Sequence, residues 1–123
     1  MRVARSRTLA RTILTRTAVT VTGPARDRAC GAAVPRGVRR VDVAIRLRVP
    51  GGCRSLSARG RLAAVRPCDE RVWLPARLRA DRRRYTLRRA ATLPPGRYLV
   101  ASRAADARGN AESRPRTVGV RVR

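Results

Sequence analysis

The chain contains no histidine, lysine, phenylalanine or glutamine. Without an imidazole, an enzyme would have to use carboxylates, cysteines or hydroxyls for proton transfer. The seven carboxylates are scattered, and only Asp69 and Glu70 are adjacent, where a strand would point them to opposite faces. Neither a glycine-rich phosphate loop nor a nucleophile elbow is present. We therefore expect a protein that is not an enzyme, with no catalytic residues and no cofactor.

Aromatic residues are almost as scarce, with only Trp73, Tyr85 and Tyr98. The core must therefore be built mainly from Val, Leu and Ala. The chain also lacks an apolar run of about 18 residues, so we expect no transmembrane helix. Residues 1–16 lack the apolar stretch of a signal peptide, and we expect any export signal to lie upstream of Met1. A length of 123 residues has room for one domain.

Negative charge is scarce too, and the net charge is +24. Taken alone, this charge favours a polyanionic partner such as nucleic acid. All 31 basic residues are Arg, however, and the residue types with AT-rich codons are absent (Lys and Phe) or rare (Asn and Ile), which indicates a GC-rich genome that uses Arg for solvated cations. The candidate polyanion patch is the one dense cluster, made of Arg82, Arg83, Arg84, Arg88 and Arg89. With few aromatic rings for stacking, polyanion binding there would be electrostatic, weak and salt-sensitive.

The three cysteines are Cys30, Cys53 and Cys68. They form no C-x-x-C pair and the chain has no histidine, so a zinc site is not expected. Cys53 and Cys68 bracket a Gly/Arg-rich stretch, and their spacing suits a disulfide across a long hairpin, which would imply an oxidising compartment. The alternative is three unpaired, small apolar side chains. Cys30 is the odd one out, either a free thiol or paired with another chain.

Alternation of apolar and polar residues is the main structural signal. From Val41 to Val49 every odd position is apolar, and the even positions include Asp42, Arg46 and Arg48, which predicts a strand with one buried and one wet face. Similar patterns occur at Val19 and Val21, Val72 to Leu78, Tyr85 and Leu87, and Val118, Val120 and Val122, with the three C-terminal valines expected to face the interior. Gly- and Pro-rich turns separate these segments. The pattern predicts an all-β antiparallel sandwich or small barrel at residues 17–123, preceded by an N-terminal extension, 1–16, that is flexible or forms an extra leading strand.

The segment from Leu93 to Val100 resembles the corner before the penultimate strand in fibronectin type III and related bacterial immunoglobulin-like (Ig-like) domains. The resemblance implies a structural corner formed by Leu93, Pro95, Gly96 and Tyr98, whose tyrosine hydroxyl hydrogen-bonds to the upstream backbone. The stretch after it is similar to the A-x-D-x-x-G-N hairpin turn of those domains, which assigns turn roles to Asp106, Gly109 and Asn110. We expect Asp106 to hydrogen-bond within this turn rather than to bind calcium, because arginines surround it. No metal site is expected.

The segment from Gly37 to Ile45 is similar to the G-V-x-x-V-x-V strand of these domains in secreted actinobacterial proteins. In that group a cysteine-bracketed hairpin and a tryptophan often follow, as Cys53, Cys68 and Trp73 do here. The resemblance implies a non-catalytic spacer, stalk or adhesive module of a secreted or surface protein, with an unknown protein or a surface polysaccharide as partner. The alternative hypothesis is an arginine-rich protein that binds nucleic acid or another polyanion.

Overall fold

The structure is a computed structural model that describes residues 11–25, 38–79, 84–106 and 115–123. Within these ranges the ordered elements are ten strands, and no helix that could span a membrane occurs. The strands are β1 (Arg11–Leu14), β2 (Ala18–Pro24), β3 (Val38–Val49), β4 (Gly52–Leu56), β5 (Leu62–Arg66), β6 (Leu74–Pro75), β7 (Arg77–Leu78), β8 (Arg84–Ala90), β9 (Gly96–Asp106) and β10 (Arg116–Val122). The predicted all-β class is confirmed.

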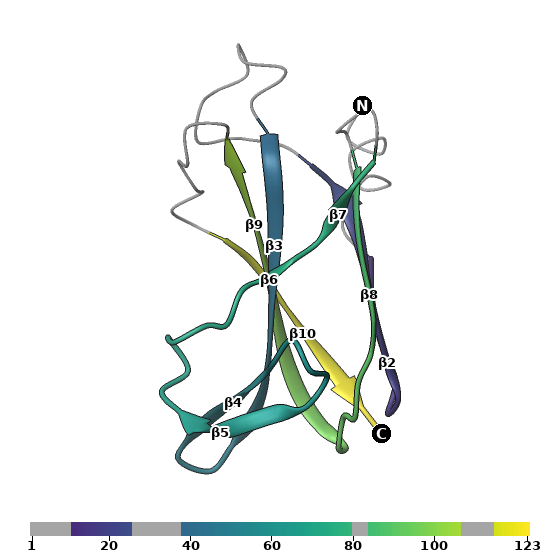
Figure 1. The fold of residues 1–123 in the computed structure, drawn as a ribbon. Coiled ribbons are helices and arrows are strands. Elements are labelled where there is room, and N and C mark those ends of the chain that lie inside the picture. The colour runs from purple at the N-terminus through teal and green to yellow at the C-terminus, as the bar shows by residue number, and fades with distance from the viewer. Residues whose placement is uncertain (1–10, 26–37, 80–83, 107–114) are drawn as a thin grey trace, which may run out of the picture.

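Two antiparallel sheets face each other as a β-sandwich (Figure 1). The small sheet has the strand order β1-β2-β8-β7. The large sheet has the order β10-β9-β3-β4-β5, and β6 also pairs with β3. β1 lies within the N-terminal segment 1–16, pairs with β2 and buries Leu14 in the core.

The core lies between the sheets and follows from the alternation within each strand. Val19 and Val21 of β2 are buried, while the threonines beside them are half-exposed. Tyr98 and Ile45 are among the largest fully buried side chains, and both belong to the large sheet. Each such side chain contributes roughly 1.5–3 kcal/mol by leaving water, so this shared interior is the main source of stability.

One short segment passes from one sheet to the other. Leu74 and Pro75 pair with β3 as β6, and the Ala76 amide donates to the Val41 carbonyl at 2.8 Å. The chain then pairs with β8 as β7, so that β6 and β7 form the diagonal between the sheets in Figure 1. Pro75 fits here because it lies in a two-residue strand at the margin of the sheet, where a missing amide donor is tolerated.

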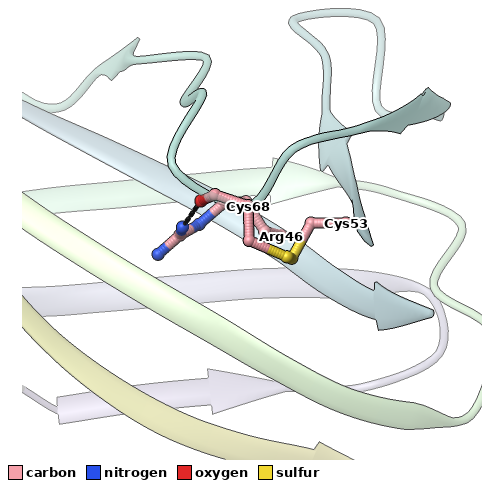
Figure 2. The surroundings of a disulfide bond; sticks show 3 residues. All are labelled: Arg46, Cys53 and Cys68. Carbon is pink, nitrogen blue, oxygen red and sulfur yellow. Dashed lines mark hydrogen bonds between the residues drawn. A yellow bond between two sulfur atoms is a disulfide. The ribbon is translucent and has the colours of Figure 1, made fainter. Parts of the chain in front are cut away.

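The prediction of one wet face on β3 is wrong over its central part. Asp42 and Arg46, both at even positions, have only 5% and 3% of their surface exposed, whereas Arg48 is exposed as expected. Residues 67–73, which we call the covering loop, contact Arg46 through Cys68 (Figure 2). Asp42 is enclosed by Arg40 and Arg103, and Trp73 of the covering loop lies against Arg103. A period-two pattern reports which side chains share a face, but not whether a distant segment later covers that face.

The prediction that the three C-terminal valines face the interior is also only partly correct. Val122 is buried and Val120 is half-buried, but Val118 has 45% of its surface exposed. Val118 is opposite Val100, yet β10 is the outer strand of the large sheet. Because an edge strand has a neighbour on one side only, the described part of the facing sheet leaves this position open to solvent.

Candidate functional site

A connected group of polar and charged side chains lies on the outer face of the large sheet, under the covering loop. We call it the outer cluster: Arg40, Asp42, Arg46, Arg71, Trp73 and Arg103. β3 supplies the first three residues, the covering loop supplies Arg71 and Trp73, and β9 supplies Arg103.

A disulfide between Cys53 and Cys68 fixes one end of the covering loop (Figure 2). Cys53 belongs to β4 and Cys68 follows β5, so the bond closes the β4–β5 hairpin at its open end, with the two Cα atoms 4.9 Å apart. The predicted pairing is confirmed. Cys30, the third cysteine, lies outside the described residues.

Arg46 lies beneath the same cysteine. Its Nη1 donates a hydrogen bond to the Cys68 carbonyl, which Figure 2 shows beside the disulfide. Burial, together with the nearby positive charge of Arg71, lowers the pKa of Arg46. Its Nε is buried and has no hydrogen-bond partner among the described residues. Arg46 is therefore a desolvated cation held mainly by one backbone carbonyl.

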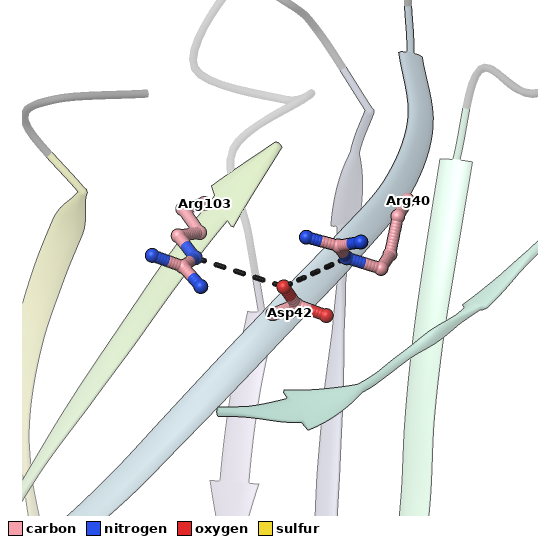
Figure 3. Close-up of polar contacts among 3 residues, drawn as sticks. All are labelled: Arg40, Asp42 and Arg103. Carbon is pink, nitrogen blue, oxygen red and sulfur yellow. Dashed lines mark hydrogen bonds and ion pairs between the residues drawn. The ribbon is translucent and has the colours of Figure 1, made fainter. Parts of the chain in front are cut away.

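Asp42 is the one carboxylate of the outer cluster, and it lies between two arginines (Figure 3). Its Oδ2 is 3.0 Å from the Nε of Arg40 and 3.6 Å from the Nε of Arg103. Arg40 is half exposed, so its pairing is screened by water, whereas Arg103 is more enclosed. Asp42 thus links β3 to β9 across the outer face of the sheet.

Trp73 covers this ion pair. The guanidinium carbon of Arg103 is 4.2 Å from the centre of the Trp73 ring, and that of Arg71 is 5.9 Å away. A guanidinium over an indole face contributes about 0.5–1 kcal/mol at a partly exposed site. Trp73 therefore joins the covering loop to β9 through Arg103.

The contacts of the outer cluster hold the covering loop against β3 and β9. The two described cysteines are joined in a disulfide, and the described residues hold no group of three metal-ligating side chains. Sequence reasoning missed the cluster because it assigned Asp42 and Arg46 to a solvated face. The signal that could have found it is a carboxylate in the middle of a strongly apolar strand in a chain with few acids, since such a charge needs a partner when it is buried.

The residues of the predicted structural corner lie just before and at the start of β9. The Tyr98 hydroxyl donates to the Pro94 carbonyl at 2.6 Å, and burial raises the pKa of Tyr98 to about 12, against a smaller opposite effect of Arg54. Leu93 is buried and its amide donates to the Arg16 carbonyl at 2.9 Å. Pro95 is exposed, and Gly96 has a φ of 153° with its α-carbon against Leu47, where a Cβ would clash. The segment before β9 is thus joined to both β9 and the β1–β2 connection.

The other predicted site residues are only partly described. Asp106 ends β9, which pairs with β10, while Gly109 and Asn110 lie outside the described residues. Arg82 and Arg83 of the candidate polyanion patch also lie outside them.

The three described members of that patch are not on one face. Arg84 and Arg88 alternate with the buried Tyr85 and Leu87, so both point outward from the small sheet. Arg89 has the opposite parity, and its Nη1 donates to the Ala58 carbonyl at 3.0 Å. The patch is therefore divided by the pleat of β8.

Comparisons with known proteins add no relative to this description. No family model matches the chain, and it matches neither a curated protein nor a solved structure. The fold and its contacts are therefore the basis for the proposals below.

Proposed function

We propose that the chain is a non-catalytic Ig-like module, of the fibronectin type III kind, that serves as a spacer, stalk or adhesive domain of a secreted or surface protein. In Ig domains one sheet has the strand order A-B-E-D and the other contains C, F and G. Lettering β1, β2, β3, β7, β8, β9 and β10 from A to G in chain order turns β1-β2-β8-β7 into A-B-E-D and β10-β9-β3 into G-F-C. The β4–β5 hairpin then extends this sheet beside C, where variable-type Ig domains carry strands C′ and C″.

The hydrogen bond from Tyr98 to Pro94 is the observation that carries the proposal. In Ig-like domains a tyrosine near the start of strand F donates to the backbone a few residues upstream, which is the tyrosine corner. Tyr98 is the third residue of β9, the strand that takes the F position, and its acceptor is four residues upstream. The same corner in the same strand favours this subtype over other two-sheet sandwiches.

The disulfide supports the proposed location outside the cytosol. Disulfides form and persist in secreted proteins and are rare in reducing compartments. A module that works as a spacer needs a fold that survives outside the cell, and the Cys53–Cys68 bond and the outer cluster both strengthen the large sheet.

The test compares the chain produced with and without an export signal. Under non-reducing conditions, mass spectrometry of exported material is expected to find the peptides of Cys53 and Cys68 linked, with trypsin cleaving the folded domain slowly despite its many arginines. In cytosolic material both cysteines should react with an alkylating reagent. If both cysteines of exported protein react completely, the extracellular assignment is wrong.

The Ig-like subtype is tested by a separate measurement. An experimental structure should place the Tyr98 hydroxyl within hydrogen-bond distance of the Pro94 carbonyl, with β1-β2-β8-β7 facing β10-β9-β3. A different pairing of β8, for example with β9 in one sheet, would overturn the Ig-like assignment while leaving the disulfide result untouched.

A further inference from the structure

The outer face of the small sheet is rich in threonine and arginine side chains. We call it the threonine–arginine face. Because Val19, Val21, Tyr85 and Leu87 point into the core, their neighbours on β2 and β8 point outward. Outward-facing members are Arg11, Ile13, Thr20, Thr22, Arg77, Arg84, Thr86 and Arg88, of which Ile13 is an exposed apolar residue at the β1 edge.

The strand register arranges these side chains in rows. Arg11 is opposite Thr22, Thr22 is opposite Thr86, and Thr86 is opposite Arg77, so one row crosses all four strands. At about 4.8 Å between strands, this row extends roughly 14 Å. Along β8, Arg84 and Arg88 are separated by roughly 13 Å at about 3.3 Å per residue. Four guanidinium groups therefore surround a centre of threonine hydroxyls.

Charge on this face is unbalanced within the described residues. Asp42, Asp69 and Glu70 all belong to the large sheet or to the connection after β5, and the arginines of the ion pairs are Arg40, Arg66 and Arg103. None of the four arginines on the threonine–arginine face makes an ion pair with a described residue. Like charges gathered on one face attract an anionic partner.

The shape and chemistry of the face narrow the class of that partner. It presents no aromatic ring, because Tyr85 and Tyr98 are buried and Trp73 lies on the other sheet, so bases have no platform for stacking. Guanidinium groups bind carboxylate or sulfate in a bidentate manner, and threonine hydroxyls can both donate to and accept from sugar hydroxyls. A sheet face suits an extended chain.

We propose that the threonine–arginine face binds an acidic polysaccharide, a linear sugar chain that bears carboxylate or sulfate groups. The proposal rests on the extracellular location proposed above, and it replaces the arginine cluster of the sequence with a face built from four strands. It shares Arg84 and Arg88 with that cluster, adds Arg11 and Arg77, and leaves out Arg89.

The experiment compares two triple variants that remove the same charge. The face variant carries Arg77→Ser, Arg84→Ser and Arg88→Ser. Its matched control carries Arg48→Ser, Arg97→Ser and Arg121→Ser, three exposed arginines of the large sheet. Binding to polygalacturonate, to heparin, to neutral dextran and to a DNA duplex is measured by calorimetry at about 150 mM salt and at two lower concentrations. Circular dichroism verifies that both variants are folded.

We expect the native protein to bind polygalacturonate or heparin and not dextran. The face variant should bind at least about tenfold more weakly, with a shallower dependence on salt, because three ion contacts are lost. The control variant should keep its affinity within about threefold. An equal loss in both variants would reduce the effect to net charge and overturn the proposal.

Two further results would also overturn it. One is tighter binding to duplex DNA than to either acidic polysaccharide, with the same loss in the face variant, which would make nucleic acid the partner. The other is absence of binding to both acidic polysaccharides at the lowest salt concentration. Neither result would alter the disulfide mapping or the strand order, so failure of this proposal is distinguishable from failure of the Ig-like assignment.

Discussion

The two sheets of the sandwich have outer faces of opposite kinds. On the large sheet, Asp42 and Arg46 are buried under a loop that the disulfide fixes at Cys68. On the small sheet, Arg77 and Arg88 are exposed and lack carboxylate partners among the described residues. Both faces carry arginines at alternate strand positions. They differ in whether another part of the chain covers those arginines. One face contributes to stability, and the other is the face for which we propose a partner.

Removing the disulfide is the most direct way to abolish the difference between the covered outer face of the large sheet and the uncovered outer face of the small sheet. In the chain-entropy model, the double variant Cys53→Ser, Cys68→Ser should lose about 3 kcal/mol of unfolding free energy, since a loop of about 15 residues is no longer closed in the unfolded state. The covering loop should also loosen and expose the outer face of β3. Urea unfolding measures the first effect, and hydrogen exchange of the β3 amides measures the second.

Cys30→Ser is the control for the loss of a cysteine as such, and the double variant is compared with it. If the double variant unfolds at the same urea concentration as the native protein, the covering loop is held by the outer cluster alone, and the disulfide is not the cause of the difference between the faces.

The interior shared by both sheets should respond to pH through Tyr98. Its pKa is about 12 in the folded protein, against about 10 for an unfolded tyrosine, so the folded state retains the proton more strongly. The stabilisation is complete below pH 10 and is lost as the pH rises from 10 to 12. At about 1.4 kcal/mol per pKa unit, roughly 2–3 kcal/mol should disappear across this window.

Absorbance at the tyrosinate band, followed during an alkaline titration, measures this prediction. One tyrosine should titrate near pH 12 only as the protein unfolds, and Tyr98→Phe should remove that transition and flatten the loss of stability. If the transition that Tyr98→Phe removes lies near pH 10 in folded protein, the corner is open to water.

Local pattern predicted the part of the fold that depends on neighbours in sequence. The strands around Val19, Ile45 and Leu87, and the Cys53–Cys68 pair, followed from alternation and spacing. The burial of Asp42 did not follow, because it depends on a loop that begins more than twenty residues further along the chain. Burial by a segment that is distant in sequence leaves no trace in the apolar–polar alternation of the strand that it covers.

The candidate site residues divide in the same way, into those predictable from local sequence and those brought together by long-range strand pairing. The corner at Tyr98 is local, and its residues could be named from the sequence. The threonine–arginine face could not, since Arg11 and Arg77 come together only through the register of four strands. Sequence reasoning instead chose arginines that are adjacent in the chain, and the pleat of β8 separates Arg88 from Arg89.

Asp42→Asn tests the covered face without changing its shape. The amide retains hydrogen bonding but cannot neutralise Arg103, so we expect a loss of about 1–2 kcal/mol, less than for a fully buried ion pair because Arg40 is half exposed. Thermal unfolding of Asp42→Asn and of the exposed control Asp69→Asn provides the comparison. Equal melting temperatures for the two variants would contradict an energetic role for the Arg40–Asp42–Arg103 group.

Arg46→Met asks whether the buried cation itself stabilises the covered face. Methionine fills a similar volume and removes the desolvation cost that lowers the pKa of Arg46, but it also removes the donor to the Cys68 carbonyl. These effects oppose each other, so the unfolding free energy should change by no more than about 1 kcal/mol. A loss above about 2 kcal/mol would mean that the hydrogen bond to Cys68 outweighs desolvation.

Arg88→Ser is the corresponding change on the uncovered face, and it should be almost silent. Arg88 is exposed, makes no ion pair with a described residue and lies opposite Thr20, so the unfolding free energy should change by less than about 0.5 kcal/mol. A small gain would come from weaker repulsion among the arginines of this face, and it should shrink in high salt. A loss of more than about 1 kcal/mol, measured by urea unfolding, would mean that the threonine–arginine face is already used within the fold, and that it is not free to bind a partner.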